Sequence, residues 1–263
     1  MTNSIIDGNG IRRQCGLLEP DPAFVCSLPV FENAIPLWSD SEIMEAASDP
    51  AQVMGRNQFA KFVRDQKQQS SCNSFASVGG YSITRRKAGI VDDKVFSTAF
   101  TYSLMNHGRD GGSALSEGLQ VSLATGFCEE SIVPYEQIFP HLQPRRAEAL
   151  ADAAKHRAMI AYAVETKQGF YTALAKGFVV IVAVSAGGNF SNPANGYAKA
   201  DSGKGNHAIL SVDLTVKDGK LWADTLNSWG DDYGAGGFVY LGWESFAQTL
   251  PIHSFWALAA TEE

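Results

Sequence analysis

The chain of 263 residues is 45% hydrophobic and 19% charged, a composition typical of folded globular proteins that excludes an intrinsically disordered chain. Its 21 Lys and Arg against 28 Asp and Glu give a net charge of −7, and an acidic chain is a poor match for nucleic-acid phosphates. We therefore expect one large domain, or two lobes packed as one unit, with no nucleic-acid partner.

The apolar runs and the cysteines bear on the compartment. The longest apolar runs, 158–164 and 178–184, have seven residues each, far short of the ~20 that span a bilayer. The N-terminus has neither a basic region nor an apolar stretch, so we expect no signal peptide. The chain has four cysteines: Cys15, Cys26, Cys72 and Cys128. So few thiols indicate a reducing compartment, and we expect a cytoplasmic or virion-associated protein.

Taken in chain order, the pattern begins with an extension and continues with helices. Residues 1–34 contain glycines and prolines without a sustained period, and we expect an irregular extension before a main domain at 35–263. Ser70 and Ser71 are suited to cap a helix over 72–88, which Gly89 would end. Further helices are predicted at 115–125, where leucines recur every four residues, at 146–158 after Pro144, and at 168–176 before Gly177.

The second half of the chain changes character. Apolar and β-branched runs predict strands at 178–184, 207–212, 220–226 and 238–241. Between the first two, residues 187–205 are rich in Gly, Asn and Ser, and we expect a flexible loop that gates a site near His207. Helices first and strands later indicate an α+β protein with a helical lobe and a β lobe.

Three residues suit nucleophilic chemistry when they are taken together. Cys72 stands at a predicted helix start, where the helix dipole lowers the thiol pKa from its ordinary value of ~8.5 and so favours the thiolate. His207 opens a strand after the Gly-rich loop, and Asn227 follows another strand. Singly, these residues would be a buried thiol, a core histidine and a turn residue. Together they supply a nucleophile, a base and a group that orients the base.

Three segments resemble the papain family of cysteine peptidases. They are Val63-Arg-Asp-Gln-Lys-Gln-Gln-Ser-Ser-Cys-Asn-Ser-Phe-Ala76, Gly205-Asn-His-Ala-Ile-Leu, and Asn227-Ser-Trp-Gly-Asp-Asp-Tyr-Gly-Ala-Gly-Gly-Phe238. They occur in the family's order, with His207 135 residues and Asn227 155 residues after Cys72, close to the expected ~130–150. The resemblance covers roughly 35–263. It implies a papain-like, two-lobed α+β fold, in which the active-site cleft lies between a helical lobe and a β-barrel-like lobe.

The resemblance also implies catalytic roles. Cys72 would be the nucleophile of a thioester-forming peptidase, and His207 would be its ion-pair partner. Asn227 would orient the imidazole, completing a Cys-His-Asn triad. Gln66, six residues before Cys72, would form the oxyanion hole together with the Cys72 backbone N–H.

Three further residues would contact or shield the substrate in such an enzyme. Gly111 and Gly112 match the glycine pair along which an extended substrate backbone binds, because a residue without Cβ lets that backbone come close. Trp229 would shield the imidazole–amide bond from water. The expected substrate is a peptide or protein. The resemblance calls for no cofactor or metal, and Cys15 and Cys26 have no nearby histidine to complete a zinc site.

The sequence departs from the family pattern in places. Gln69 stands where the family carries a disulfide-forming cysteine, Asn73 replaces a large aromatic residue beside the nucleophile, and Tyr233 replaces a tryptophan. These differences favour a disulfide-poor member of the bacterial, archaeal or viral type. Residues 1–34 are short for an inhibitory propeptide, and we expect them to cover the cleft or to dock the protein onto a partner.

Two other functions stay open at this point. One keeps the chemistry but changes the substrate: a Cys–His amidase acting on cell-wall peptides, or a transamidating enzyme. The Asn227-Ser-Trp-Gly segment argues for a peptidase over these. The other is a peptidase fold reused as a structural or docking subunit of a larger assembly, such as a virus particle.

Overall fold

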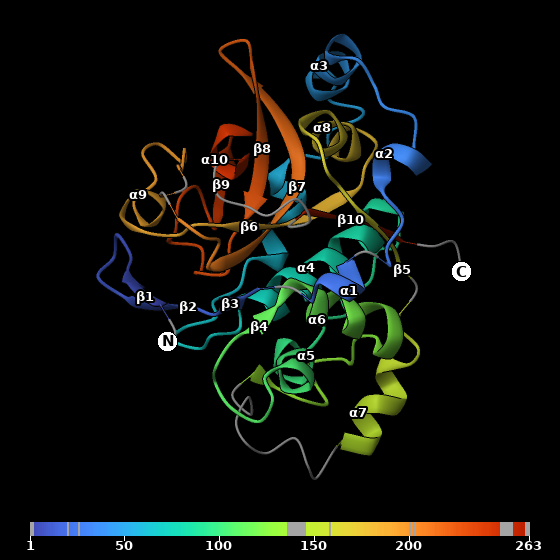
Figure 1. Ribbon diagram of the computed structural model, residues 1–263, viewed down its shortest axis with the longest axis vertical. Coiled ribbons are helices and arrows are strands. Elements are labelled where there is room, and N and C mark those ends of the chain that lie inside the picture. Colours follow the sequence, from blue (N-terminus) through green and yellow to red (C-terminus); the bar gives the residue numbers. More distant parts are fainter. Residues whose placement is uncertain are drawn as a thin grey trace.

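The computed structural model describes residues 3–19, 21–25, 27–135, 146–157, 159–199, 201, 203–247 and 255–260 (Figure 1). Two residues used above, Cys26 and Pro144, lie outside this set. The helices are α1 (Pro22–Val25), α2 (Phe31–Ala34), α3 (Asp40–Ser48), η1 (Arg56–Phe62), α4 (Cys72–Lys87), α5 (Thr98–Met105), α6 (Leu115–Gln120), η2 (Val121–Thr125), α7 (Arg146–Ala153), α8 (Lys167–Ala175), α9 (Gly188–Ser191) and α10 (Glu244–Ala247). The strands are β1 (Asn3–Ile6), β2 (Arg12–Cys15), β3 (Leu17–Leu18), β4 (Ser113–Ala114), β5 (Met159–Ala163), β6 (Val179–Val184), β7 (His207–Lys217), β8 (Lys220–Leu226), β9 (Phe238–Leu241) and β10 (Phe255–Ala260).

Six strands form one antiparallel sheet in the order β5-β10-β6-β7-β8-β9. Within the described residues, β5 and β9 are its two edges and do not pair with each other. The expectation of a barrel-like lobe is therefore wrong in that respect, because the sheet stays open. Residues 255–260, which were not predicted as a strand, lie between β5 and β6 and extend the sheet on that side.

Helix α4 lies at the boundary between the two halves of the molecule. Residues 72–84 are all buried, and the helix packs on β6, β7 and β10. Gly79 and Gly80 permit this approach, because a Cβ on Gly80 would lie 3.0 Å from Leu258 and one on Gly79 would lie 3.3 Å from Leu210. Gly89, at φ +82°, follows the end of the helix as predicted. The predicted serine cap is wrong, because the Ser71 side chain makes no capping hydrogen bond.

Separate apolar clusters cover the two sides of this arrangement. Helices α3 and α8 pack on the face of the sheet opposite α4. On the other side of α4, helices α5 and α7 enclose a cluster that includes Phe75, Phe100 and Tyr102. Figure 1 shows α5, α6 and α7 in one half of the molecule and β6–β9 in the other. This arrangement confirms the two-lobed α+β fold expected from the sequence.

Most predicted elements are confirmed, with shifted ends. Strand β8 has the predicted bounds, β6 begins one residue late, and β7 runs on to Lys217. Helix α7 ends at Ala153 rather than 158, because a turn follows it. The predicted flexible loop at 187–205, of which residues 200 and 202 are not described, is instead packed: it forms α9 and buries Phe190 and Ala198. This packing argues against a gating role.

The N-terminal segment is ordered as well, contrary to the expected irregular extension. Strands β1 and β2 form an antiparallel hairpin, with Asn3 opposite Cys15 and Ile6 opposite Arg12. Strand β3 then pairs in parallel with β4, which joins residue 17 to residue 113. The hairpin lies at the junction of the two halves of the molecule (Figure 1).

Candidate active site

Cys72 is the first residue of α4 and has no exposed surface. Burial raises the pKa of its thiol, while hydrogen bonds to the backbone of Ala208, Gly16 and Asn73 act in the opposite direction. The partners come from three parts of the chain: the sheet, the N-terminal segment and α4 itself. The sulfur therefore lies where these three parts meet.

His207 and Asn227 stand at facing ends of two adjacent strands. His207 opens β7 and Asn227 directly follows β8, and the antiparallel register with Leu210 opposite Leu226 brings them together. His207 Nε2 and Asn227 Oδ1 are 2.8 Å apart. The Trp229 ring lies over the imidazole, with centroids 4.9 Å apart, and all three side chains are buried. The bond is thus sealed from water.

The protonation of His207 follows from this burial. Burial lowers its pKa to about 4, the hydrogen bond with Asn227 opposes that shift, and the positive charge of Arg13 adds to it. Among the described residues, His207 Nδ1 has no hydrogen-bond partner, and no hydrogen bond joins it to Cys72. The two residues are instead linked through Ala208, which follows His207 and bonds to the sulfur.

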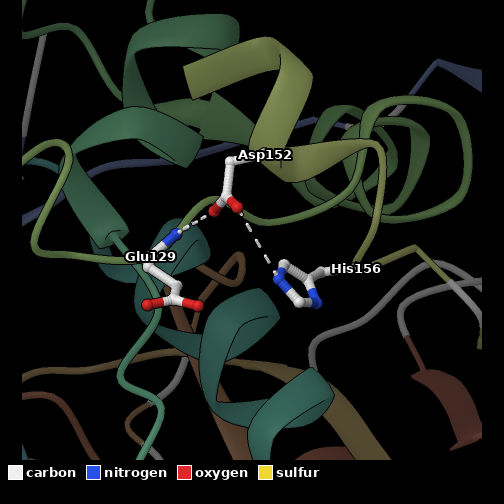
Figure 2. A group of neighbouring side chains, drawn as sticks. All are labelled: Glu129, Asp152 and His156. Carbon is white, nitrogen blue, oxygen red and sulfur yellow. Dashed lines mark hydrogen bonds and ion pairs between the residues drawn. The ribbon is translucent and has the colours of Figure 1, made fainter. Parts of the chain in front are cut away.

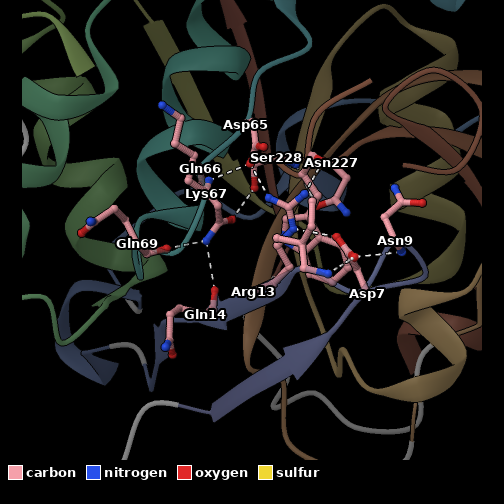
Figure 3. Close-up of polar contacts among 12 residues, drawn as sticks. Asp7, Asn9, Arg13, Gln14, Asp65, Gln66, Lys67, Gln69, Asn227 and Ser228 are labelled. Atoms are coloured by element: carbon pink, nitrogen blue, oxygen red, sulfur yellow. Dashed lines mark hydrogen bonds and ion pairs between the residues drawn. The ribbon is translucent and has the colours of Figure 1, made fainter. Parts of the chain in front are cut away.

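Gln66 is held in one orientation from several directions. Its backbone N–H donates to the Ser228 carbonyl at 2.8 Å, and its Oε1 accepts from Ser228 Oγ at 2.6 Å. The side-chain Nε2 then donates to the carbonyls of Gln14, at 3.0 Å, and Gln69, at 2.6 Å. Because Oε1 is engaged by Ser228, the amide presents its N–H donors to the Gln14 carbonyl of the N-terminal segment and to the Gln69 carbonyl, three residues before Cys72 (Figure 3).

The structure distinguishes the two glycines of the expected pair. Gly112 has φ +84°, and a Cβ there would lie 1.9 Å from the Gly16 carbonyl oxygen, so the position requires glycine. A Cβ on Gly111 would meet only the flexible Arg109 side chain, at 3.3 Å. Only Gly112 is therefore in close contact with a neighbouring backbone.

Residues 14–17 pass between the two halves of the molecule and bond to both. The Gly16 carbonyl accepts from Ser113 N at 2.9 Å, on the helical side. The Leu17 N–H donates to the carbonyl of Asn206 at 3.0 Å, on the sheet side. With the Gln14 carbonyl on Gln66, the N-terminal segment bonds to the helical side, to the sheet side and to the loop before Cys72.

Arg13 anchors this segment through its side chain, which is almost wholly buried. Its Nε donates to Asp7 Oδ2 at 2.7 Å, Nη1 pairs with Asp65, and Nη2 donates to the Trp229 carbonyl at 2.9 Å. Figure 3 shows the guanidinium between Asp7, from the hairpin, and Asp65, which directly precedes Gln66. The Arg13 side chain therefore joins the hairpin to two segments of the main domain. One contains Asp65, next to Gln66, and the other contains Trp229, whose ring lies over His207.

Two polar residues near the site were not singled out as functional from the sequence. Asn73 is buried, and its Nδ2 donates to the Ala114 carbonyl at 2.6 Å and to Ser113 Oγ at 3.1 Å, which ties α4 to β4. Asp110 accepts from Ser70 N at 2.8 Å and from the Tyr102 hydroxyl at 2.7 Å. The position of Asp110 directly before Gly111 is the one sequence signal that could have marked it.

One group in the described part of the chain has the spacing to hold a metal ion: Glu129, Asp152 and His156 (Figure 2). Lys94 already supplies a cation there, because its Nζ bonds to Glu129 at 2.6 Å and lies 3.4 Å from His156 Nε2. The Glu129 N–H also donates to Asp152 at 2.9 Å. This group fastens α7 to the segment around residue 129.

None of the helices in the described ranges is long and apolar enough to cross a bilayer. A buried thiol at a helix start, with an imidazole and an amide at the facing strand ends, is the arrangement of a cysteine hydrolase. The family model described as papain family cysteine protease matches residues 49–248, and the chain belongs to this family. The recognised family and the expected class of enzyme, a papain-like cysteine peptidase and thus a thiol protease, are confirmed.

Comparison with solved structures agrees with this fold. The structure of xylellain, a cysteine protease from Xylella fastidiosa, is 18% identical with a TM-score of 0.68, over 100% of this chain and 99% of that chain. The ragweed pollen cysteine protease Amb a 11, in its proform, is 17% identical with a TM-score of 0.62, over 89% and 68%. Digestive procathepsin L 3 of the Tenebrio molitor larval midgut is 16% identical with a TM-score of 0.60, over 76% and 66%. A search of curated proteins found no match.

Proposed function

We propose that the chain is a peptidase that cleaves peptide bonds through Cys72, His207 and Asn227, with Gln66 in the oxyanion hole. One observation carries this proposal: His207 Nε2 is engaged by Asn227 at 2.8 Å, which leaves Nδ1 for the thiol. An imidazole held in this way is oriented and has one nitrogen free to accept a proton.

In the proposed reaction, His207 takes the thiol proton and the Cys72 sulfur attacks the carbonyl carbon. The resulting oxyanion accepts hydrogen bonds from Gln66 Nε2 and the Cys72 N–H. His207 then gives its proton to the leaving amine as the C–N bond breaks, which leaves a thioester. Water then attacks the thioester carbonyl carbon while His207 takes a proton from the water. The C–S bond breaks, the carboxylic acid is released, and His207 returns its proton to the Cys72 sulfur.

The acyl part of a substrate would lie along Gly112 and Ser113, with the leaving group toward Trp229. The N-terminal segment already bonds along this path, but it runs from the Trp229 side at Arg13 to the Ser113 side at Leu17. Its direction is therefore opposite to that of a substrate. A peptide bond presented in reverse places its amine and carbonyl on the wrong sides of the nucleophile, which explains how the segment can lie there intact.

We therefore propose that residues 1–34 keep the domain at 35–263 in a latent form, and that the partner of this segment is the chain's own active site. The closed state also opposes chemistry, because burial raises the pKa of Cys72 and lowers that of His207. Both changes favour a neutral thiol and imidazole over the ion pair.

Gly16→Ala tests the latent form and the nucleophile together. A Cβ at this position would lie 2.3 Å from the Ser70 carbonyl oxygen, so the substitution should displace the segment. We expect a papain-type epoxide inhibitor to add once to the Gly16→Ala protein by intact mass, at least about tenfold faster than to the unmodified chain. Gly16→Ala/Cys72→Ala should give no adduct, and Gly16→Ala/His207→Ala should give little.

The matched control is Gly188→Ala, where a Cβ meets nothing within 4 Å. It should react at the rate of the unmodified chain. Cleavage of a casein-like protein, set against isolated peptidoglycan, then separates peptidase from amidase. An adduct that persists in Gly16→Ala/Cys72→Ala, or a folded Gly16→Ala protein that never reacts, would exclude the proposed mechanism.

A further inference from the structure

We infer that Asp65 and the Trp229 carbonyl form a subsite for an arginine side chain of the substrate, on the leaving-group side of the scissile bond. The inference deepens the proposed function and rests on it. The N-terminal segment acts here as an internal ligand: the Arg13 guanidinium is buried against Asp65 through Nη1 and against the Trp229 carbonyl through Nη2, at 2.9 Å.

The subsite remains when the segment leaves. Asp7, the third partner of Arg13, belongs to the same hairpin and departs with it. Asp65 and Trp229 belong to the main domain and form a β-bridge with each other. What stays behind is the Asp65 carboxylate and the Trp229 carbonyl oxygen, each of which has lost the N–H donor that Arg13 supplied.

The two acceptors are held in place by the domain itself. Asp65 Oδ1 accepts from the Lys67 backbone N–H at 2.6 Å, which fixes the carboxylate. Residues 65 and 229 also form a β-bridge, and the neighbouring Gly230 N–H donates to the Arg64 carbonyl at 3.1 Å. The spacing of the two acceptors is therefore set before any ligand arrives.

This geometry suits arginine better than lysine. A guanidinium presents N–H donors in a planar fork, and two of its nitrogens reach separate acceptors at once. An ammonium is a compact charge on a flexible stem and satisfies such a spread pair less well. The reversed direction of the segment changes its backbone bonds, but not the chemistry of the pocket that receives its side chain.

The location assigns the side of the substrate. Gln14, the residue after Arg13, has its carbonyl on Gln66 Nε2, which is the proposed oxyanion donor. Residues 16 and 17 lie toward Ser113, along the proposed path of the acyl part. Arg13 is therefore beyond the nucleophile, where the residues that follow the scissile bond would lie.

The test uses the full chain with Gly16→Ala, which should displace the segment, together with Arg13→Ala, which removes the internal arginine. Peptide substrates carry either arginine or citrulline, its neutral isostere, at the first or second position after the scissile bond. We expect kcat/KM to be at least about fivefold higher for arginine at one of these positions. Asp65→Asn in the same background should bring the ratio close to one. Asp92→Asn, which removes a carboxylate paired with Arg85 at the far end of α4, should leave the ratio unchanged.

A binding measurement makes the result independent of turnover. In the Arg13→Ala/Gly16→Ala/Cys72→Ala protein, in which the chain's own segment should be displaced, calorimetry compares peptides of residues 10–18 that carry arginine or citrulline at position 13. We expect the arginine peptide to bind at least about fivefold more tightly, and Asp65→Asn to abolish the difference. Equal affinities, or no binding of either peptide, would overturn the subsite. Failure to cleave any peptide while this preference persists would instead count against the peptidase.

Discussion

Cys72 and His207 are both wholly buried, and burial moves their pKa values in opposite directions. The thiol is held protonated by its raised pKa, and the imidazole is held neutral by a pKa of about 4. A thiolate–imidazolium pair is thereby disfavoured as long as the N-terminal segment covers both groups. Opening the site to water would return each group toward its ordinary pKa.

The pH dependence of stability follows from these two groups. Below the ordinary histidine pKa of ~6.5, the His207 imidazole binds a proton in open or unfolded chains but stays neutral in the closed form. The stability of the closed form therefore falls as pH drops from about 6.5 toward 4. The difference between the ordinary pKa and the pKa of buried His207 corresponds to roughly 3 kcal/mol of stability. Above the ordinary thiol pKa of ~8.5, open chains release a proton that the closed form retains, so stability falls again.

The closed form should therefore be most stable between about pH 6.5 and 8.5. We expect the thermal midpoint to fall less between pH 6.5 and 4.5 in His207→Gln than in the unmodified chain, because the imidazole no longer contributes. Carboxylates titrate equally in both proteins, so the difference isolates His207. The same acid loss in the two proteins would contradict the assignment.

At the scale of elements, one carboxylate ties the nucleophile loop to the glycine pair. Asp110 accepts from Ser70 N, just before the nucleophile, and from the Tyr102 hydroxyl, which in turn accepts from Gly112 N at 3.2 Å. Burial, with the Asp110 hydrogen bond, raises the pKa of Tyr102, so its hydroxyl stays a donor. Hydrogen bonds hold this region of the chain, where Gln69 replaces the family's disulfide-forming cysteine.

We expect Asp110→Ala to lower kcat/KM roughly tenfold in the Gly16→Ala background, because a hydrogen bond to a charged group contributes about 1.5–3 kcal/mol. Asp110→Asn keeps an acceptor oxygen and should retain most of the activity. Tyr102→Phe keeps the bond to Ser70 and should fall between the two. Equal rates in the Ala and Asn variants would show that the acceptor has no role.

The elements also show what the sequence could and could not predict. Helix α4 was predicted from its basic last turn before Gly89, and strand β8 from its run of apolar and β-branched residues. Gln66, Cys72, His207 and Asn227 were predicted as site residues because they stand in short sequence motifs. Strand β2 was missed, since its Arg13 looks like a surface charge until Asp65, 52 residues away, is placed beside it. Asp110 was missed because its partner beside Cys72, the Ser70 N–H, lies 40 residues away in the sequence.

At the scale of the whole molecule, the buried Arg13 side chain joins the hairpin to the main domain, so its removal should loosen the hairpin and leave the rest of the fold in place. Arg13→Ala leaves Asp7 buried without its cation, a situation that costs about 3–5 kcal/mol in buried pairs, although the Asn9 and Ile11 backbone N–H groups offset part of it. We expect hydrogen exchange in residues 3–18 to rise at least about tenfold, with α4 unchanged.

Arg12→Ala is the matched control, because its exposed guanidinium bonds only to the Ser4 hydroxyl, at 3.3 Å, among the contacts described. Exchange in this variant should equal that of the unmodified chain. If both variants exchange alike, Arg13 does not hold the hairpin.

Strand β2 runs opposite to a substrate and belongs to the same chain as the site that it covers. Because strand β2 is tethered to the site it fills, dilution does not release it, and its local concentration is on the order of millimolar. A free copy of residues 10–18 would have to reach a similar level to reinstate closure once the tether were cut. Latency is then a property of each molecule, insensitive to how much protein is present, and cutting the tether would be close to irreversible.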